Sequence, residues 1–178
     1  MIVMNLKLDN FLLFKDFQIN MSYPKKIVGS TIGEEHLKDR PNFRYKKLII
    51  LMGANATGKT ALGRIMLCIF NFIHKKEYSA IVDLIEDPTQ PARFEIDFVV
   101  EDNTLFRVST LISSSRDRSY DSSNISVNVM STPILPKDNY EQCASRFEKK
   151  KHDMSSNYIV ELEKVPALTW MFEFPFAS

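Results

Sequence analysis

The sequence is poor in the features that mark specialised classes of protein. Its 178 residues include only two cysteines, Cys68 and Cys143, which are too few for a disulfide framework in a chain of this length. No apolar run reaches the roughly 18 residues that a membrane span needs. The first residues, Met1 to Leu6, lack the basic segment of a signal peptide. We therefore expect a soluble cytoplasmic protein with reduced thiols and no membrane partner.

An excess of charge of either sign is also missing. Lysine and arginine total 23 and aspartate and glutamate 22, so the net charge of +1 neither favours nor excludes nucleic acid. The 44% hydrophobic content is enough for a core, which excludes global disorder, and the length fits one domain. The three histidines have no metal-ligand spacing with one another or with a cysteine.

The first third of the chain is predicted to begin with paired strands. Alternation of apolar and polar residues predicts a strand at 2–8 and a second within 12–21, together an antiparallel N-terminal β-hairpin spanning 2–21. Residues 22–47 contain prolines and glycines, so we expect a surface excursion with a short helix at 34–39.

Residues 48–87 are predicted to form a strand, a loop and a helix. Leu48–Met52 is apolar throughout, which predicts a strand buried on both faces. From Thr60 to Ile73 apolar residues follow helical spacing on nearly all sides, so a buried helix is expected. A further helical turn is expected within 78–85.

The second half, residues 93–178, is predicted to be β-rich. Residues 93–101 and 105–112 alternate on either side of a turn and predict a hairpin. Further strands are expected at 125–130 and 158–165.

Two polar stretches and one apolar stretch interrupt this β-rich half. Residues 113–124 and 137–157 are expected to be mobile loops, the second with a solvated helix or loop. The apolar tail Trp170–Phe176 needs a partner surface or forms a final buried strand.

One stretch carries recognisable chemistry, because residues 53–60 match the pattern G-x-x-x-x-G-K-[ST]. Glycines let the backbone approach phosphates closely, successive N–H groups form an anion-binding nest, and the following helix directs its dipole at the same phosphates. The pattern predicts binding of a nucleoside triphosphate, most simply ATP with Mg²⁺, by Gly53, Ala54, Asn55, Ala56, Thr57, Gly58, Lys59, Thr60 and Ala61. Lys59 is expected to reach the β- and γ-phosphates, and the Thr60 hydroxyl is expected to ligate Mg²⁺.

The chain around this loop resembles the ATPase heads of the SMC, RecF and OLD families, which are ABC-type ATPases of the broader AAA-family kind. The resemblance covers residues 2–73. It rests on Asn10-Phe11 after the first strand, on Phe14 and Phe17, and on Asn55 at the third position of the loop. It implies an α/β P-loop NTPase fold, specifically the N-terminal half of an ABC-type head. Such a half has a mixed sheet and an antiparallel β subdomain around one buried helix.

The resemblance also implies a function. The intact protein would bind ATP and Mg²⁺, dimerise head to head and hydrolyse ATP slowly, in DNA repair or phage defence. In these families a basic residue often follows Asn-Phe. Here that position is Leu12, and Lys15 is the nearest substitute. A glutamine of these heads touches Mg²⁺ and the attacking water, for which Gln90 and Gln142 are the candidates.

Other parts of such a head are absent from the sequence. Asp83 and Glu101-Asp102 match the acidic motif only superficially, since the first reads as a helix end and the second as a hairpin turn. The glycines stop at Gly63, so there is no Ser-Gly-rich signature segment. We therefore expect hydrolysis to need a C-terminal half or a partner chain. The alternatives are a complete small P-loop kinase and a nucleotide-sensing interaction module.

Overall fold

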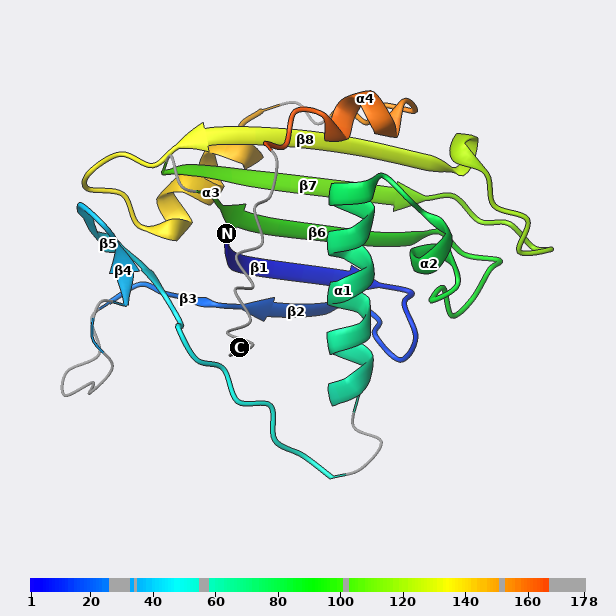
Figure 1. The fold of residues 1–178 in the computed structure, drawn as a ribbon, viewed down its shortest axis with the longest axis horizontal. Helices are drawn as coiled ribbons and strands as arrows, with labels where there is room; N and C mark the ends of the chain where they lie inside the picture. The colour runs from blue at the N-terminus through cyan, green and yellow to red at the C-terminus, as the bar shows by residue number, and fades with distance from the viewer. Residues whose placement is uncertain (26–32, 34, 55–57, 101–102, 151–152, 167–178) are drawn as a thin grey trace, which may run out of the picture.

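The main sheet has five strands in the order β2-β1-β6-β7-β8, and every neighbouring pair is antiparallel (Figure 1). The computed structural model describes residues 1–25, 33, 35–54, 58–100, 103–150 and 153–166. The chain is thus a mixed α/β structure. The strands of this sheet are β1 (Ile2–Asp9), β2 (Phe17–Asn20), β6 (Ala92–Val99), β7 (Thr104–Ile112) and β8 (Ile125–Pro133).

Both predicted hairpins are present. β1 pairs with β2 with Leu6 opposite Ile19, and β6 pairs with β7 from Val99 opposite Leu105. The predicted strand at 125–130 is confirmed within β8. These strands were predictable because one face of each is apolar and the other polar, which imposes a period of two on the sequence.

One face of the sheet is covered by helix α1 (Lys59–Lys75), which crosses the strands in Figure 1. Ile65, Ile69 and Phe72 are fully buried and share one core cluster with the inward residues of β1, β6, β7 and β8. The Phe72 ring meets the Phe94 ring edge to face, with centroids 5.8 Å apart. The predicted helix is confirmed, but it is not buried on nearly all sides, since Leu67 is 60% exposed. The short helix α2 (Ser79–Val82) confirms the further helical turn.

The opposite face carries helix α3 (Tyr140–Glu148), held by a buried ionic network. The Arg107 guanidinium donates to both carboxylate oxygens of Asp97, at 2.7 and 2.8 Å, and the Tyr140 hydroxyl donates to Asp97 at 2.6 Å. The same guanidinium lies 5.0 Å from the ring centroid of Phe147 and also pairs with Glu148. The helix expected within 137–157 therefore exists, but its inner side is buried rather than solvated.

Three of the expected elements are wrong, and the first lies in the surface excursion. The surface excursion holds a second sheet of β3 (Ser22–Tyr23), β5 (Arg40–Tyr45) and β4 (His36–Leu37), so the short helix at 34–39 is not formed. Phe43 of β5 is fully buried and packs edge to face with Tyr140, which draws this segment into a strand.

The strand expected at 158–165 is instead helix α4 (Tyr158–Leu162). The Asn157 side chain caps its N-terminus, and the Tyr158 ring stacks on Phe72. The Glu161 carboxylate accepts the backbone N–H of Val129 at 3.0 Å, which satisfies an edge group of β8. These contacts outweigh the β propensity of Ile159 and Val160.

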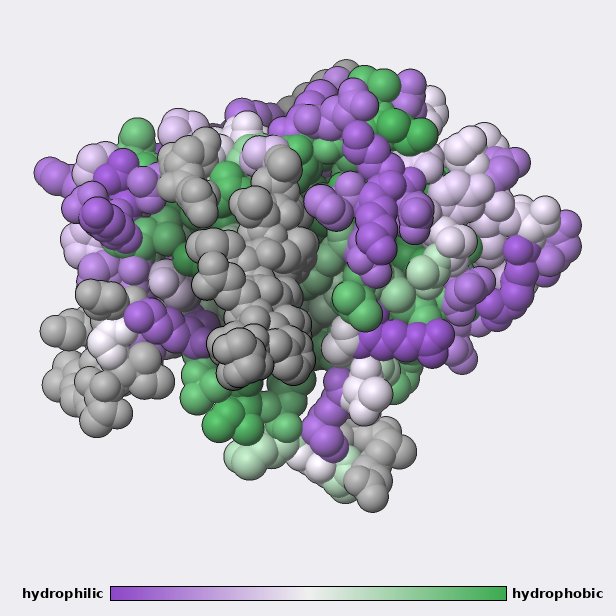
Figure 2. Space-filling model, viewed as in Figure 1, coloured by the Kyte–Doolittle hydropathy of each residue, from purple (hydrophilic) through white to green (hydrophobic). Residues whose placement is uncertain are grey.

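The strand expected at Leu48–Met52 is also wrong, because these residues have no regular structure and are exposed. Ile50 is 68% and Met52 87% exposed. A strand buried on both faces needs hydrogen-bonding neighbours at its edges. The described residues supply none, so the mixed sheet expected around this strand is not present among them. Figure 2 shows the run as a hydrophobic surface at the lower edge of the molecule.

Some expectations fall partly or wholly outside the described residues. Asn55–Thr57 and the apolar tail Trp170–Phe176 belong to this group. Within 113–124 the Arg118 side chain donates to the carbonyls of Ile85 and Glu86, so this loop is tied to the α2–β6 turn. In the part of the chain that is described, no helix is long and apolar enough to cross a membrane.

The Arg107–Asp97 pair yields a stability prediction. Arg107→Met leaves the Asp97 carboxylate buried without its counter-charge, which is expected to lower the free energy of unfolding by roughly 3–5 kcal/mol. Arg93→Met is the matched control, because Arg93 is exposed on the neighbouring strand, and its effect is expected within about 0.5 kcal/mol. Urea unfolding of both variants decides. Equal losses of unfolding free energy in the two variants would contradict the stabilising role given to the buried Arg107–Asp97 pair.

Candidate nucleotide site

The N-terminus of α1 has the features of an anion site. Gly58 is its N-cap, in the left-handed region with φ 89°, and no side chain caps this end. The first turn contains no acidic residue, and the first helical bond runs from the Leu62 N–H to the Gly58 carbonyl at 2.9 Å. The N–H groups of the first turn therefore have no acceptor within the helix, and the dipole of 17 residues ends here. Such an end favours a phosphate.

Lys59 places a positive charge at the same point. Its ammonium donates to the carbonyl oxygens of Gly53 and Ala54, both at 2.7 Å. The two ends of the predicted phosphate loop are thus brought together, although Asn55–Thr57 lie outside the described residues. Thr60 is the next residue of the helix after Lys59, and it is exposed. Phosphates entering the loop would compete with the two carbonyls for the Lys59 ammonium.

A turn from the N-terminal hairpin lies directly against this helix end. A Cβ placed on Gly58 would come 2.9 Å from Leu13 Cδ1 and 3.4 Å from Phe14 Cζ. Glycine is therefore favoured at position 58 by its φ, and a side chain there would also have to displace the end of the exposed Leu13 side chain. The sequence pattern predicts the glycine at position 58. It does not predict the contact with Leu13, which is an exposed residue outside any motif.

Asn10 clamps that turn to the rest of the domain. Its buried side chain donates to the carbonyls of Asp87, Gln90 and Pro91 at 2.8, 3.2 and 3.3 Å, and it accepts the Asp87 N–H at 2.9 Å. Asn10 itself has φ 62°, a region that asparagine tolerates better than most residues. The Asn-Phe pair thus has a structural role here, which the turn signal after the first strand only partly indicated.

The turn also fixes Leu12 and Lys15. The Leu12 N–H bonds to the Leu84 carbonyl at 2.9 Å with φ 50°. Lys15 lines a cavity of about 320 Å³ together with Asp87 and Gln90, and none of the described residues of the phosphate loop lines it. Among the described residues, Lys15 therefore lies beside the turn before β6 rather than beside the phosphate loop.

Neither glutamine candidate is brought to the loop either. Gln90 belongs to the turn before β6, where its carbonyl accepts from Asn10. Gln142 completes the capping box of α3, accepting the Asn139 N–H at 2.9 Å, on the sheet face opposite α1. The positions of Gln90 and Gln142 therefore do not support the prediction that either contacts Mg²⁺.

The superficial acidic motifs also have other roles. Asp83 is the C-cap of α2, as the sequence indicated. Glu101-Asp102 lies outside the described residues, between the paired strands β6 and β7. Among the described residues no group of three His, Cys, Asp or Glu side chains could hold a metal ion. Thr60 is thus the one predicted Mg²⁺ ligand that stands beside the helix N-terminus.

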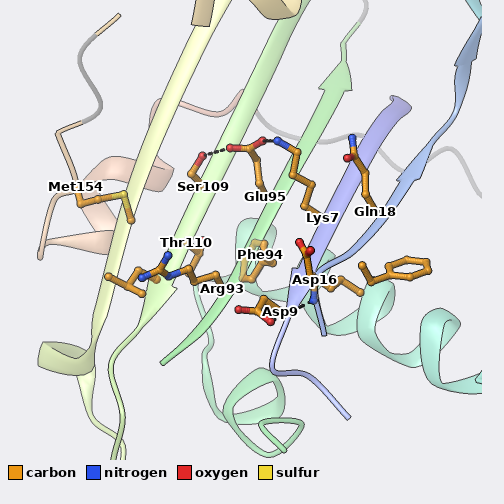
Figure 3. Close-up of a pocket in the computed structure, with 13 residues that line it drawn as sticks. Lys7, Asp9, Asp16, Gln18, Arg93, Phe94, Glu95, Ser109, Thr110 and Met154 are labelled. Carbon is orange, nitrogen blue, oxygen red and sulfur yellow. Dashed lines mark hydrogen bonds and ion pairs between the residues drawn. The ribbon is translucent and has the colours of Figure 1, made fainter. Parts of the chain in front are cut away.

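A cavity opens on the sheet face opposite α1, lined by residues of β1, β2, β6 and β7 (Figure 3). It measures about 620 Å³ and is floored by a row in which Lys7 pairs with Glu95 at 2.9 Å and Ser109 donates to Glu95 at 3.0 Å. Burial raises the pKa of Glu95, but the Lys7 hydrogen bond and the charge of Arg107 outweigh burial and hold it below its usual value. The ionisable residues that line the cavity carry both signs of charge, with acidic residues in slight excess: Lys7, Asp9, Asp16, Arg93 and Glu95.

No protein-family model and no curated protein matches the chain.

Gly58 yields the second prediction. Gly58→Ala is expected to lower the free energy of unfolding by roughly 1–3 kcal/mol, because it forces a side chain into a left-handed backbone and against Leu13. Gly63→Ala is the control, since a Cβ there meets nothing within 4 Å, and it is expected to stabilise the helix by about 0.5–1 kcal/mol. Denaturant unfolding measures both. Two variants that shift stability in the same direction would contradict this account of the helix start.

Proposed function

We propose that the chain is the ATP-binding N-terminal portion of an ATPase of the SMC, RecF and OLD kind, acting in DNA repair or phage defence. The observation that carries the proposal is the start of α1. A 17-residue helix begins at a left-handed glycine without a side-chain cap, and the Lys59 ammonium folds back over the carbonyls of Gly53 and Ala54. This combination suits a phosphate group rather than a plain β-to-α turn.

Each residue of the site has a distinct part in the proposal. The N–H groups of the first turn and the Lys59 ammonium bind the phosphates. Thr60 holds Mg²⁺, which when bound neutralises phosphate charge. Leu13 packs against Gly58 and keeps the helix start in place. The antiparallel sheet behind α1 fits the β subdomain that the resemblance implies, and the P-loop NTPase fold as a whole is part of the proposal.

Hydrolysis by this chain alone is not expected. No acidic side chain occurs in the first turn of α1, Gln90 lies in the turn before β6, and Gln142 caps α3 on the opposite face of the sheet. We assign the second Mg²⁺ ligand and the water-activating glutamate to a further half, in the same polypeptide or in a partner chain, and to a head-to-head dimer of the intact protein. If that protein binds DNA, the slightly acidic cavity on the sheet face opposite α1 is a poor surface for the DNA phosphates.

Of the two alternatives, the nucleotide-sensing module is also supported by the structure at the start of α1. A loop that binds ATP but meets no catalytic acid could report nucleotide to a partner without turnover. Supplying the further half separates the two, since only the ATPase would then hydrolyse ATP. A complete kinase is less suited, because its alternating βα units would give parallel strands, and the main sheet described here is antiparallel.

The direct test is nucleotide binding by the Lys59→Ala variant. Loss of a charge-assisted bond costs about 1.5–3 kcal/mol, so MgATP affinity is expected to fall roughly tenfold to a hundredfold while the fold is kept. Lys75→Ala, at the other end of the same helix, is the control and is expected to bind like the unsubstituted chain. Calorimetric titration measures both affinities. Unchanged affinity in Lys59→Ala would refute the assignment, and robust turnover by the chain alone would refute the expected need for a further half.

A further inference from the structure

A further cavity, of about 450 Å³, lies at the C-terminal end of α1, the opposite end of the helix from the phosphate loop. It is formed where three segments meet that are far apart in the sequence: the connection from α1 to α2, the loop before β8 and the start of α4 (Figure 1). The Tyr158 hydroxyl donates to the Lys76 carbonyl at 3.0 Å, and Arg118 donates to the carbonyls of Ile85 and Glu86, so the three segments are tied together. We term this space the tyrosine cavity.

Three of the six tyrosines of the chain line the tyrosine cavity: Tyr78, Tyr120 and Tyr158. The rings of Tyr78 and Tyr158 are nearly perpendicular, at 89°, with centroids 6.1 Å apart. The Tyr158 ring is held in place by stacking on Phe72, with centroids 5.6 Å apart. A cation is attracted to the face of an aromatic ring when it lies within about 6 Å of the centroid. Adjoining aromatic walls of this kind are therefore suited to an organic cation.

The Tyr120 hydroxyl is a buried polar group that lacks a partner. Its oxygen is buried, and among the described residues no group forms a hydrogen bond with it. Buried polar atoms in proteins are nearly always paired with protein, water or ligand. Because Tyr120 lines the cavity, an N–H of a bound ligand could donate to this oxygen and satisfy it.

The unpaired charges at the tyrosine cavity are negative. Glu77 and Asp83 line it, and among the described residues neither carboxylate has a hydrogen-bond or ion-pair partner. The C-terminal end of α1 adds the negative end of the helix dipole. Two cations also line the cavity, but Lys76 pairs with Glu163 at 3.3 Å, and the Arg118 guanidinium donates to two backbone carbonyls at 3.1 Å. The groups left to meet a ligand therefore favour a cation.

We propose that the tyrosine cavity binds a small organic cation with N–H donors, an alkylammonium group. The alkyl chain packs against the tyrosine rings, the ammonium lies near the carboxylates of Glu77 and Asp83, and one N–H donates to the Tyr120 hydroxyl. Aromatic walls with a few polar groups are typical of small-ligand sites of this size. A free amine and the lysine side chain of another protein present the same chemical group. The proposal stands apart from nucleotide binding, because the described residues that line the cavity lie at the other end of α1 from the phosphate loop.

The test is titration of the ¹⁵N-labelled chain with n-butylammonium chloride at constant ionic strength. Saturable shifts are expected in the amides of Tyr78, Asp83 and Tyr120, with a dissociation constant in the millimolar range that suits so small a ligand. Butanoate, which has the same chain length and the opposite charge, is expected to cause no saturable shift. Butyltrimethylammonium has no N–H to donate to Tyr120 and is expected to bind more weakly. Nα-acetyl-lysine methylamide separates the two sources: binding as tight as that of butylammonium identifies a lysine side chain, and weaker binding identifies a free amine.

Two variants separate ligand binding from a structural role. Tyr120→Phe removes only a hydroxyl that has no partner among the described residues, so the stability of the fold is expected to be kept. Its dissociation constant for butylammonium is nevertheless expected to rise roughly threefold to tenfold, and Asp83→Asn is expected to raise it by a similar factor. Glu86→Gln is the matched control, because Glu86 is an exposed carboxylate nearby in the chain that does not line the cavity. Its affinity is expected to equal that of the unsubstituted chain.

Several outcomes would overturn the proposal. Butylammonium that causes no saturable shift at the three amides would do so, as would butanoate that binds there in its place. Affinities of Tyr120→Phe and Asp83→Asn that equal the affinity of Glu86→Gln would also contradict it. Butyltrimethylammonium that binds as tightly as butylammonium would overturn the hydrogen bond assigned to the Tyr120 hydroxyl.

Discussion

The packing of α1 across the antiparallel sheet is the interaction on which the candidate site depends. Ile65, Ile69 and Phe72 are fully buried in the shared core, and this fixes the axis of the helix. At the start of that axis Leu13 closes over Gly58, and Asn10 ties the Leu13 turn to the segment before β6. The point where a phosphate would bind is therefore set by core packing and by one clamped turn.

The elements that the sequence predicted well are those whose pattern reflects burial within the described residues. β1, β6, β7 and β8 alternate because one face meets α1, and α1 repeats at helical spacing because one stripe meets the sheet. Local sequence signals were enough to predict that a helix ends at Asp83. For α4 they did not, since β-branched residues suggested a strand, whereas the Asn157 cap and the Tyr158–Phe72 stack select a helix.

The candidate site was predictable in chemistry and not in arrangement. The glycines and Lys59 follow from the phosphate-loop pattern, because only those residue types allow the backbone approach and supply the charge. The contact of Leu13 with Gly58 and the capping role of Gln142 depend on segments far apart in sequence, so no local pattern encodes them. Leu48–Met52 was read as an inner strand because its composition requires cover. Among the described residues that cover is absent, and the requirement remains visible as an exposed apolar run.

The central claim is that the first turn of α1 binds the phosphates, and amide chemical shifts on the ¹⁵N-labelled chain test it most directly. Titration with MgATP is predicted to shift the amides of Gly58, Lys59, Thr60 and Ala61 most strongly and to leave Arg93 and Glu95, in the cavity on the sheet face opposite α1, unchanged. Saturable shifts confined to that cavity, or no shifts in the first turn of α1, would contradict the account.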